Sequence, residues 1–72
     1  MMNRILITGA AGTLGTMLRD KLRGHAKILR LSDVAEMPPA GAGEEVVPCD
    51  LSDGDAVMRL VEGCDGIVHL GG

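Results

Sequence analysis

The sequence contains no phenylalanine, tyrosine or tryptophan. Single-stranded nucleic acids bind proteins largely by stacking their bases on aromatic side chains, so this absence argues against such a ligand. The formal net charge of −3 also disfavours the approach of a phosphate backbone. We therefore expect no nucleic-acid partner.

Cysteine is scarce, and long apolar runs are absent. Cys49 and Cys64 are not spaced as Cys-x-x-Cys and have no series of histidines near them, which favours free buried thiols in a reducing cytosol over a disulfide or a metal site. The apolar run at the N-terminus stops at Gly9, which makes it too short for a signal-peptide core or a membrane span. The sequence therefore predicts a cytoplasmic protein without a membrane partner or a bound metal.

Glycine, in contrast, is abundant, and three glycines form the stretch Gly9-Ala10-Ala11-Gly12-Thr13-Leu14-Gly15. This stretch follows the apolar run 5–7 and precedes a segment with helical periodicity. In such a strand–turn–helix unit Gly9 makes the tight turn, Gly12 lets the backbone approach a pyrophosphate, and Gly15 lets the helix pack closely on the strand. The start of the helix attracts an anion because its backbone N–H groups are unpaired. The stretch predicts a phosphate-binding turn, provided that an acid follows at the right distance.

Hydrophobic periodicity predicts four strands, over residues 4–8, 27–32, 45–48 and 66–70. Helices are expected over 13–23 and from Ser52 to Val61, with Ser52 and Asp55 forming a capping box. The core-facing stripe of the first helix is expected to contain Leu14, Met17, Leu18 and Leu22. Met58 is expected to fill the core, His69 to have a structural role, and His25 to face solvent.

Asp33 stands at the end of the second predicted strand, about 20 residues beyond the glycines. In dinucleotide-binding folds an acid at this position accepts hydrogen bonds from the adenosine ribose. A carboxylate there repels a 2′-phosphate, and no Arg or Lys occurs between Ser32 and Glu45 to neutralise one, so NAD is favoured over NADP. The alternative is an Asp that only opens a turn.

The order of these elements predicts an α/β fold with right-handed crossovers and a parallel sheet in the order 3-2-1-4, with flanking helices. A ligand is expected where the strand order reverses, between the first and fourth strands. The carboxyl ends of the strands bring four segments to that edge, namely 9–15, Asp33, Asp50-Leu51 and Leu70-Gly71-Gly72.

These residues resemble the extended short-chain dehydrogenase/reductases, the NAD-dependent epimerase/dehydratase superfamily. The resemblance is carried by Thr8 to Gly15, the acid after the second strand, Cys49-Asp50-Leu51 and Val68-His69-Leu70-Gly71-Gly72. Within this group, the stretches 28–31, 49–51 and 63–72 are similar to the bacterial uronate dehydrogenases. That similarity implies NAD-dependent oxidation of glucuronate or galacturonate at the anomeric carbon to the aldarolactone, in a full-length protein that is a homo-oligomer.

The resemblance also implies a role for each matching residue. The pyrophosphate would contact Gly9, Gly12, Thr13, Leu14 and Gly15. Asp33 would bind the adenosine ribose, Asp50 and Leu51 the adenine, and Leu70, Gly71 and Gly72 the ribose on the nicotinamide side. The catalytic Tyr-x-x-x-Lys of this group and its Ser partner have no counterpart, because the chain contains no tyrosine. No residue of the chain is therefore expected to be catalytic.

A chain of 72 residues is short for a parallel sheet that needs helices on both faces. We expect residues 1–72 to be the N-terminal part of a single NAD-binding Rossmann domain. Two alternatives to a uronate dehydrogenase remain open: a sugar-nucleotide epimerase or dehydratase of the same superfamily, and a non-catalytic dinucleotide sensor.

Overall fold

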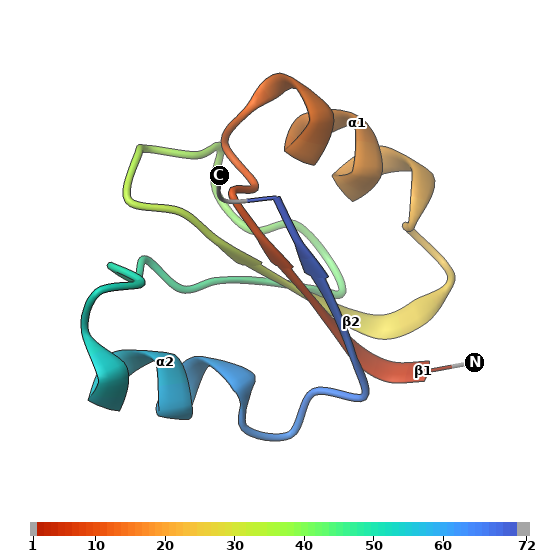
Figure 1. Cartoon of the computed structure of the whole chain (residues 1–72). Coiled ribbons are helices and arrows are strands. Elements are labelled where there is room, and N and C mark those ends of the chain that lie inside the picture. The colour runs from red at the N-terminus through yellow and green to blue at the C-terminus, as the bar shows by residue number, and fades with distance from the viewer. Residues whose placement is uncertain (1, 71–72) are drawn as a thin grey trace.

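A single parallel sheet lies between two helices in the computed structural model, which describes residues 2–70 (Figure 1). Along the chain the elements are β1 (Met2–Thr8), α1 (Thr13–Lys21), β2 (Ala26–Ser32), β3 (Glu44–Val46), α2 (Gly54–Val61) and β4 (Gly66–His69). All three strand pairings are parallel, and the strand order is β3-β2-β1-β4. The predicted α/β class and the predicted order 3-2-1-4 are confirmed.

The central strand β1 is buried on both faces, as its run of aliphatic residues predicts. Ile5 and Ile7 belong to the core on the α1 side, together with Leu29 and Leu31 of β2. Leu6 points to the other face, where it packs with Leu60 of α2 and with Cys49. Because successive side chains of a strand alternate between the faces of the sheet, one strand supplies both cores.

The predicted core stripe of α1 is only half right. Leu18 and Leu22 pack against the core, but Leu14 and Met17 are 53% and 49% exposed. The helix lies close to the sheet at Gly15, which is buried. Leu14 and Met17 each precede a core-facing residue, Gly15 and Leu18, and the rotation of the helix from one residue to the next turns their side chains away from the sheet. In α2, Met58 is 71% exposed, so its predicted place in the core is wrong as well.

The N-terminus of α2 is capped by Asp53 and not by Ser52. The Asp53 side chain accepts a hydrogen bond from the backbone N–H of Ala56 at 3.2 Å. The Ser52 hydroxyl instead donates to Asp50 Oδ1 at 2.8 Å. At the other end of the helix, Arg30 of β2 donates to the carbonyls of Leu60 and Glu62. Both ends of α2 are therefore held by side chains.

We expect Asp53→Ala to lower the free energy of unfolding by about 1 kcal/mol, the usual cost of losing an N-cap. Ser52→Ala is the matched control, because it removes a neighbouring exposed hydroxyl without uncapping the helix. Urea unfolding of both variants measures the difference. A larger loss for Ser52→Ala would restore Ser52 as the cap.

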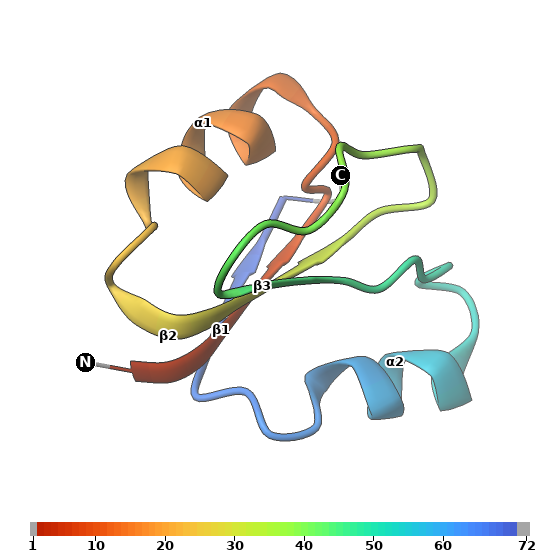
Figure 2. The same ribbon diagram turned by 180° about the vertical axis from the view of Figure 1, so that it is seen from behind.

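The segment between β2 and β3 runs on the α1 side of the sheet, as Figure 2 shows. Arg19 of α1 holds this segment. Its guanidinium donates to both carboxylate oxygens of Glu44, at 2.9 and 2.8 Å, and to the carbonyls of Pro38 and Pro39. Glu44 also accepts from the backbone N–H of Gly41 at 2.8 Å. This cluster, which we call the Arg19–Glu44 clamp, fixes the loop between β2 and β3 against the helix.

Cys49 is buried and Cys64 partly buried, and both are free thiols, as predicted. Within residues 2–70 no three His, Cys, Asp or Glu side chains are grouped in a way that could hold a metal ion. The helices of this described range are all too short or too polar to cross a membrane. His25 is exposed, as expected.

Candidate functional site

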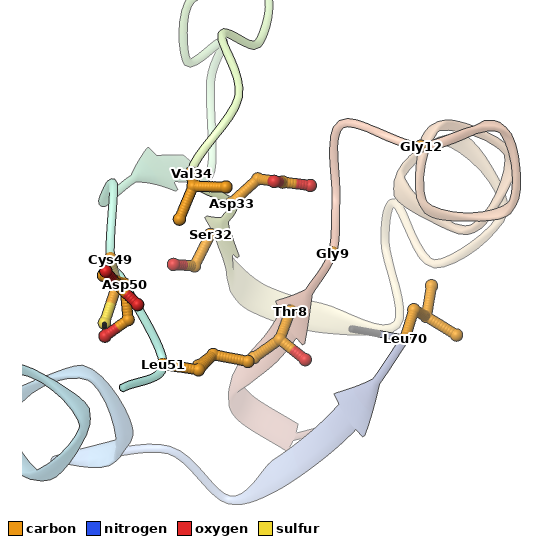
Figure 3. Close-up of a pocket in the computed structure, with 10 residues that line it drawn as sticks. All are labelled: Thr8, Gly9, Gly12, Ser32, Asp33, Val34, Cys49, Asp50, Leu51 and Leu70. Atoms are coloured by element: carbon orange, nitrogen blue, oxygen red, sulfur yellow. Dashed lines mark hydrogen bonds between the residues drawn. The ribbon is translucent and has the colours of Figure 1, made fainter. Parts of the chain in front are cut away.

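A cleft of about 570 Å³ opens at the carboxyl edge of the sheet (Figure 3). It receives the last residues of β1 and β2 and residues from the segments that follow each of the four strands. Its lining consists of Thr8, Gly9, Gly12, Ser32, Asp33, Val34, Cys49, Asp50, Leu51 and Leu70. The cleft therefore lies where the reversal of strand order predicts a ligand.

The glycine-rich stretch forms the turn between β1 and α1. Gly9 has a φ of +69°, a conformation that side chains disfavour, and its carbonyl accepts a hydrogen bond from the N–H of Gly12 at 3.2 Å. A Cβ atom built on Gly15 would lie 2.6 Å from the Cα of Ala10, whereas one built on Gly12 would meet only the Gly9 carbonyl oxygen, at 3.5 Å. Gly9 and Gly15 are thus required by the turn itself, while Gly12 keeps open the space beside the cleft.

The two helices differ at their N-termini. Gly12 is the N-cap of α1, and that end of the helix has neither a side-chain cap nor an acidic residue in its first turn. The first turn of α2 has its own cap, Asp53, and its own acid, Asp55. A negative charge at a helix N-terminus is stabilised by roughly 0.3–1 kcal/mol. α2 supplies this charge from its own first turn, whereas the first turn of α1 contains no acid.

Asp33, immediately after β2, reaches across to the glycine turn. Its Oδ2 accepts from the N–H of Ala11 at 3.0 Å, and its Oδ1 from the N–H of Ala35 at 3.1 Å. Hydrogen bonds from the backbone of Ala35, and next of Ala11, lower the pKa of the Asp33 carboxyl. The carboxylate is only partly buried and lies at the wall of the cleft (Figure 3). It is therefore ionised, ordered and still accessible to a ligand hydroxyl.

Asp50 and Leu51 form the wall opposite the glycine turn. Asp50 Oδ1 accepts from the backbone N–H and the hydroxyl of Ser52, at 2.9 and 2.8 Å. These two hydrogen bonds, the backbone one first, lower the pKa of Asp50. Leu51 is 43% exposed and presents an apolar surface beside the cleft.

Three polar side chains stand in register at the ends of the strands. Thr8 of β1 is paired with Ser32 of β2 on one side and with His69 of β4 on the other. Thr8 Oγ1 and His69 Nδ1 are 2.7 Å apart and hydrogen-bonded. The structural role expected for His69 agrees with this contact, although the residue as a whole is exposed. Leu70 follows directly and donates its N–H to the Thr8 carbonyl at 3.1 Å.

The sequence-predicted site residues fall into three groups. Six of them line the cleft: Gly9, Gly12, Asp33, Asp50, Leu51 and Leu70. Thr13, Leu14 and Gly15 lie in the first turn of α1, outside the lining, and Gly71 and Gly72 lie outside the described residues. The ligand contacts assigned to all eleven residues stay predictions.

Sequence reasoning missed four lining residues, Thr8, Ser32, Val34 and Cys49. Each of them directly precedes or follows a residue that was predicted, namely Gly9, Asp33 or Asp50. For Thr8 and Ser32 the signal that would have found them is position, because the last residue of a parallel strand reaches the same edge of the sheet as the residue that follows it.

Known proteins resemble this chain closely. It is 65% identical over 71 residues to a uronate dehydrogenase of Pseudomonas syringae pv. tomato, an alignment that covers 97% of this chain and 26% of the relative. Among solved structures, a uronate dehydrogenase point mutant from Agrobacterium tumefaciens, complexed with NAD, matches with a TM-score of 0.97 and 57% identity over 100% of this chain and 27% of that one. A glucuronic acid dehydrogenase from Chromohalobacter salexigens matches with a TM-score of 0.94 and 53% identity over the same shares.

The chain thus spans about a quarter of the length of these relatives. The sequence also matches the NAD dependent epimerase/dehydratase family over residues 5–72. This match includes the glycine turn, Asp33, the segment 49–51 before α2 and Leu70 after β4, all of which contribute to the cleft. The chain therefore belongs to the NAD dependent epimerase/dehydratase family.

Proposed function

We propose that residues 1–72 form the dinucleotide-binding part of an NAD-dependent uronate dehydrogenase and the N-terminal part of its Rossmann domain. The observation that carries the proposal is the meeting of the glycine turn, the uncapped start of α1 and the Asp33 carboxylate at one cleft. A turn free of side chains and a positive helix end suit a pyrophosphate, and an ionised acid beside them suits a ribose. The identity to uronate dehydrogenases supports the choice of substrate.

Each part of the cleft is assigned to one part of the cofactor. The turn, with Gly9, Gly12 and the first-turn residues Thr13, Leu14 and Gly15, takes the pyrophosphate. Asp33 takes the adenosine ribose, while Asp50 and Leu51 contact the adenine from the opposite wall. Leu70, with Gly71 and Gly72, takes the ribose on the nicotinamide side. Bound NAD would supply the hydride acceptor for oxidation of the uronate at its anomeric carbon to the aldarolactone.

In this proposal residues 1–72 bind and orient the cofactor but do not transfer protons. Residues 1–72 contain no tyrosine, so the Tyr-x-x-x-Lys motif that acts in related dehydrogenases is not drawn from them. The reaction is tested by following NADH formation in the protein that carries this sequence, with galacturonate and glucuronate as substrates. NADH formation with neither acid, together with conversion of a nucleotide sugar, would favour a sugar-nucleotide epimerase or dehydratase. Binding of NAD without any turnover would favour a dinucleotide sensor.

We expect Asp33→Ala to weaken NAD binding by about 1–3 kcal/mol, the range for losing a hydrogen bond to a charged group. The variant loses the support of the Ala11 N–H for both cofactors, but only NAD loses the ribose contact as well. Isothermal titration calorimetry should therefore give a clearly smaller loss for NADP than for NAD.

Asp20→Asn is the control for that titration, since Asp20 is an exposed acid on α1 outside the cleft lining. It should leave both affinities within about twofold of the original protein. If Asp33→Ala weakened the binding of NAD and of NADP equally, Asp33 would support the turn but would not recognise the ribose.

The free thiols of Cys49 and Cys64 are consistent with a reducing compartment, and we propose the cytoplasm. The homo-oligomeric state expected from the family resemblance stays a prediction, which sedimentation of the protein can test.

A further inference from the structure

Ser32 is the last residue of β2, and it is almost fully buried at 1% exposure. Its hydroxyl is the one buried side-chain polar atom within residues 2–70 that has no hydrogen-bond partner. Leaving such a group unpaired costs roughly 1–3 kcal/mol, so buried hydroxyls are normally paired. Two other hydroxyls have partners: that of Thr8, the residue in register with Ser32, bonds His69, and that of Ser52 bonds Asp50.

The place of Ser32 in the sheet points its side chain at the cleft. Ser32 is in register with Thr8, and side chains in register on neighbouring parallel strands point to the same face. Figure 3 shows the Ser32 side chain directed toward Cys49 and Asp50, across the space between β2 and the segment before α2. This is the part of the cleft between the acid proposed for the ribose and the wall proposed for the adenine.

We propose that the Ser32 hydroxyl is a hydrogen-bonding group of the adenosine subsite, bonding the adenosine close to its glycosidic bond. The inference rests on the proposed function, because it needs a dinucleotide in the cleft. A serine hydroxyl turns among three staggered positions about a single bond, so it can meet the ligand without movement of the backbone. Nothing else in residues 2–70 competes for it, since it forms no bond within the chain.

This role predicts effects of opposite direction on stability and on binding. In Ser32→Ala the unpaired hydroxyl is lost, so the melting temperature without ligand should stay equal or rise by a few degrees. The affinity for NAD should fall by about three- to tenfold, which corresponds to one neutral hydrogen bond. ADP-ribose, which carries adenosine but no nicotinamide, should lose affinity by the same factor.

Thr8→Val is the matched comparison, because it removes a hydroxyl from the same row and the same face that already has a partner. This variant should lower the melting temperature, in contrast to Ser32→Ala. Calorimetric titration with NAD and ADP-ribose and a thermal melt of each variant supply the three measurements, all on the protein that carries this sequence.

The outcomes separate this inference from the proposal on which it rests. If the original protein binds NAD and ADP-ribose and Ser32→Ala binds both equally well, the inference is wrong and the dinucleotide site stands. A lower melting temperature for Ser32→Ala would also overturn it, because the hydroxyl would then have a partner within the protein. If the original protein binds neither ligand, the dinucleotide site itself fails, and the role of Ser32 fails with it.

Discussion

Gly15→Val should unfold or severely loosen the turn between β1 and α1. The first added carbon alone would lie 2.6 Å from the Cα of Ala10, 2.6 Å from the carbonyl oxygen of Gly9 and 2.8 Å from the carbonyl carbon of Ala10. All three atoms belong to the backbone, so no side chain can move aside. Overpacking usually costs about 1–3 kcal/mol, and we expect a loss at or above the upper end. The midpoint of urea unfolding measures it.

Gly12→Val is the matched control, with the same side chain added at the same turn. A Cβ atom at Gly12 would make only an ordinary contact, 3.5 Å from the Gly9 carbonyl oxygen. Its φ of −74° is open to any residue. The variant should therefore fold with unchanged far-UV circular dichroism, while its NAD affinity falls at least about tenfold because the side chain occupies the pyrophosphate space. A normal unfolding midpoint for Gly15→Val, or normal NAD binding by Gly12→Val, would contradict this division of roles.

The helix α1 shows where sequence patterns fail. Apolar periodicity selected Leu14, Met17, Leu18 and Leu22, but the residues that meet the rest of the structure are Gly15, Leu18, Arg19 and Leu22. These four have the spacing i, i+3, i+4 and i+7 of one helix face. A glycine and an arginine on a buried face contribute no hydrophobic signal. The stripe predicted from apolar residues therefore lies to one side of the helix face that packs against the rest of the structure.

The strand order and most of the cleft could be predicted, because they follow from local patterns and from the handedness of parallel crossovers. Gly9, Gly12 and Asp33 were found because their residue types are needed where they stand. Ser32 and Cys49 were not, since a small buried residue at the end of a strand has no distinctive pattern. The pairing of Arg19 with Glu44 could not be predicted from local patterns either, because the two residues are 25 positions apart in the sequence and meet only in the folded structure.

Glu44 is the acid on which the position of the loop between β2 and β3 depends. Its side chain is 4% exposed, and that of Arg19 is 11% exposed. The hydrogen bonds from Arg19 outweigh the effect of burial and lower the pKa of Glu44 from its usual 4.5 to about 2. Arg23, whose guanidinium lies 3.7 Å from the carboxylate, adds a weaker attraction. Removing the carboxylate charge would leave the nearly buried Arg19 guanidinium without its counter-charge.

Glu44→Gln should therefore lower the free energy of unfolding by about 3–5 kcal/mol at pH 7, the usual cost of breaking a buried ion pair from one side. A carboxyl with a lowered pKa stabilises the folded state fully above its unfolded pKa, near 4.5, and loses this contribution as the pH falls toward about 2. The stability gap between the original protein and Glu44→Gln should thus shrink from pH 5 downward and nearly close by pH 2. Urea unfolding at a series of pH values measures the gap.

Asp20→Asn is the control. It removes the same charge from an acid whose side chain is 80% exposed, in a surface pair with Arg23. This variant should change stability by less than about 1 kcal/mol at every pH. A gap for Glu44→Gln as small as that of Asp20→Asn, or one that does not depend on pH, would mean that the Arg19–Glu44 clamp does not hold the loop.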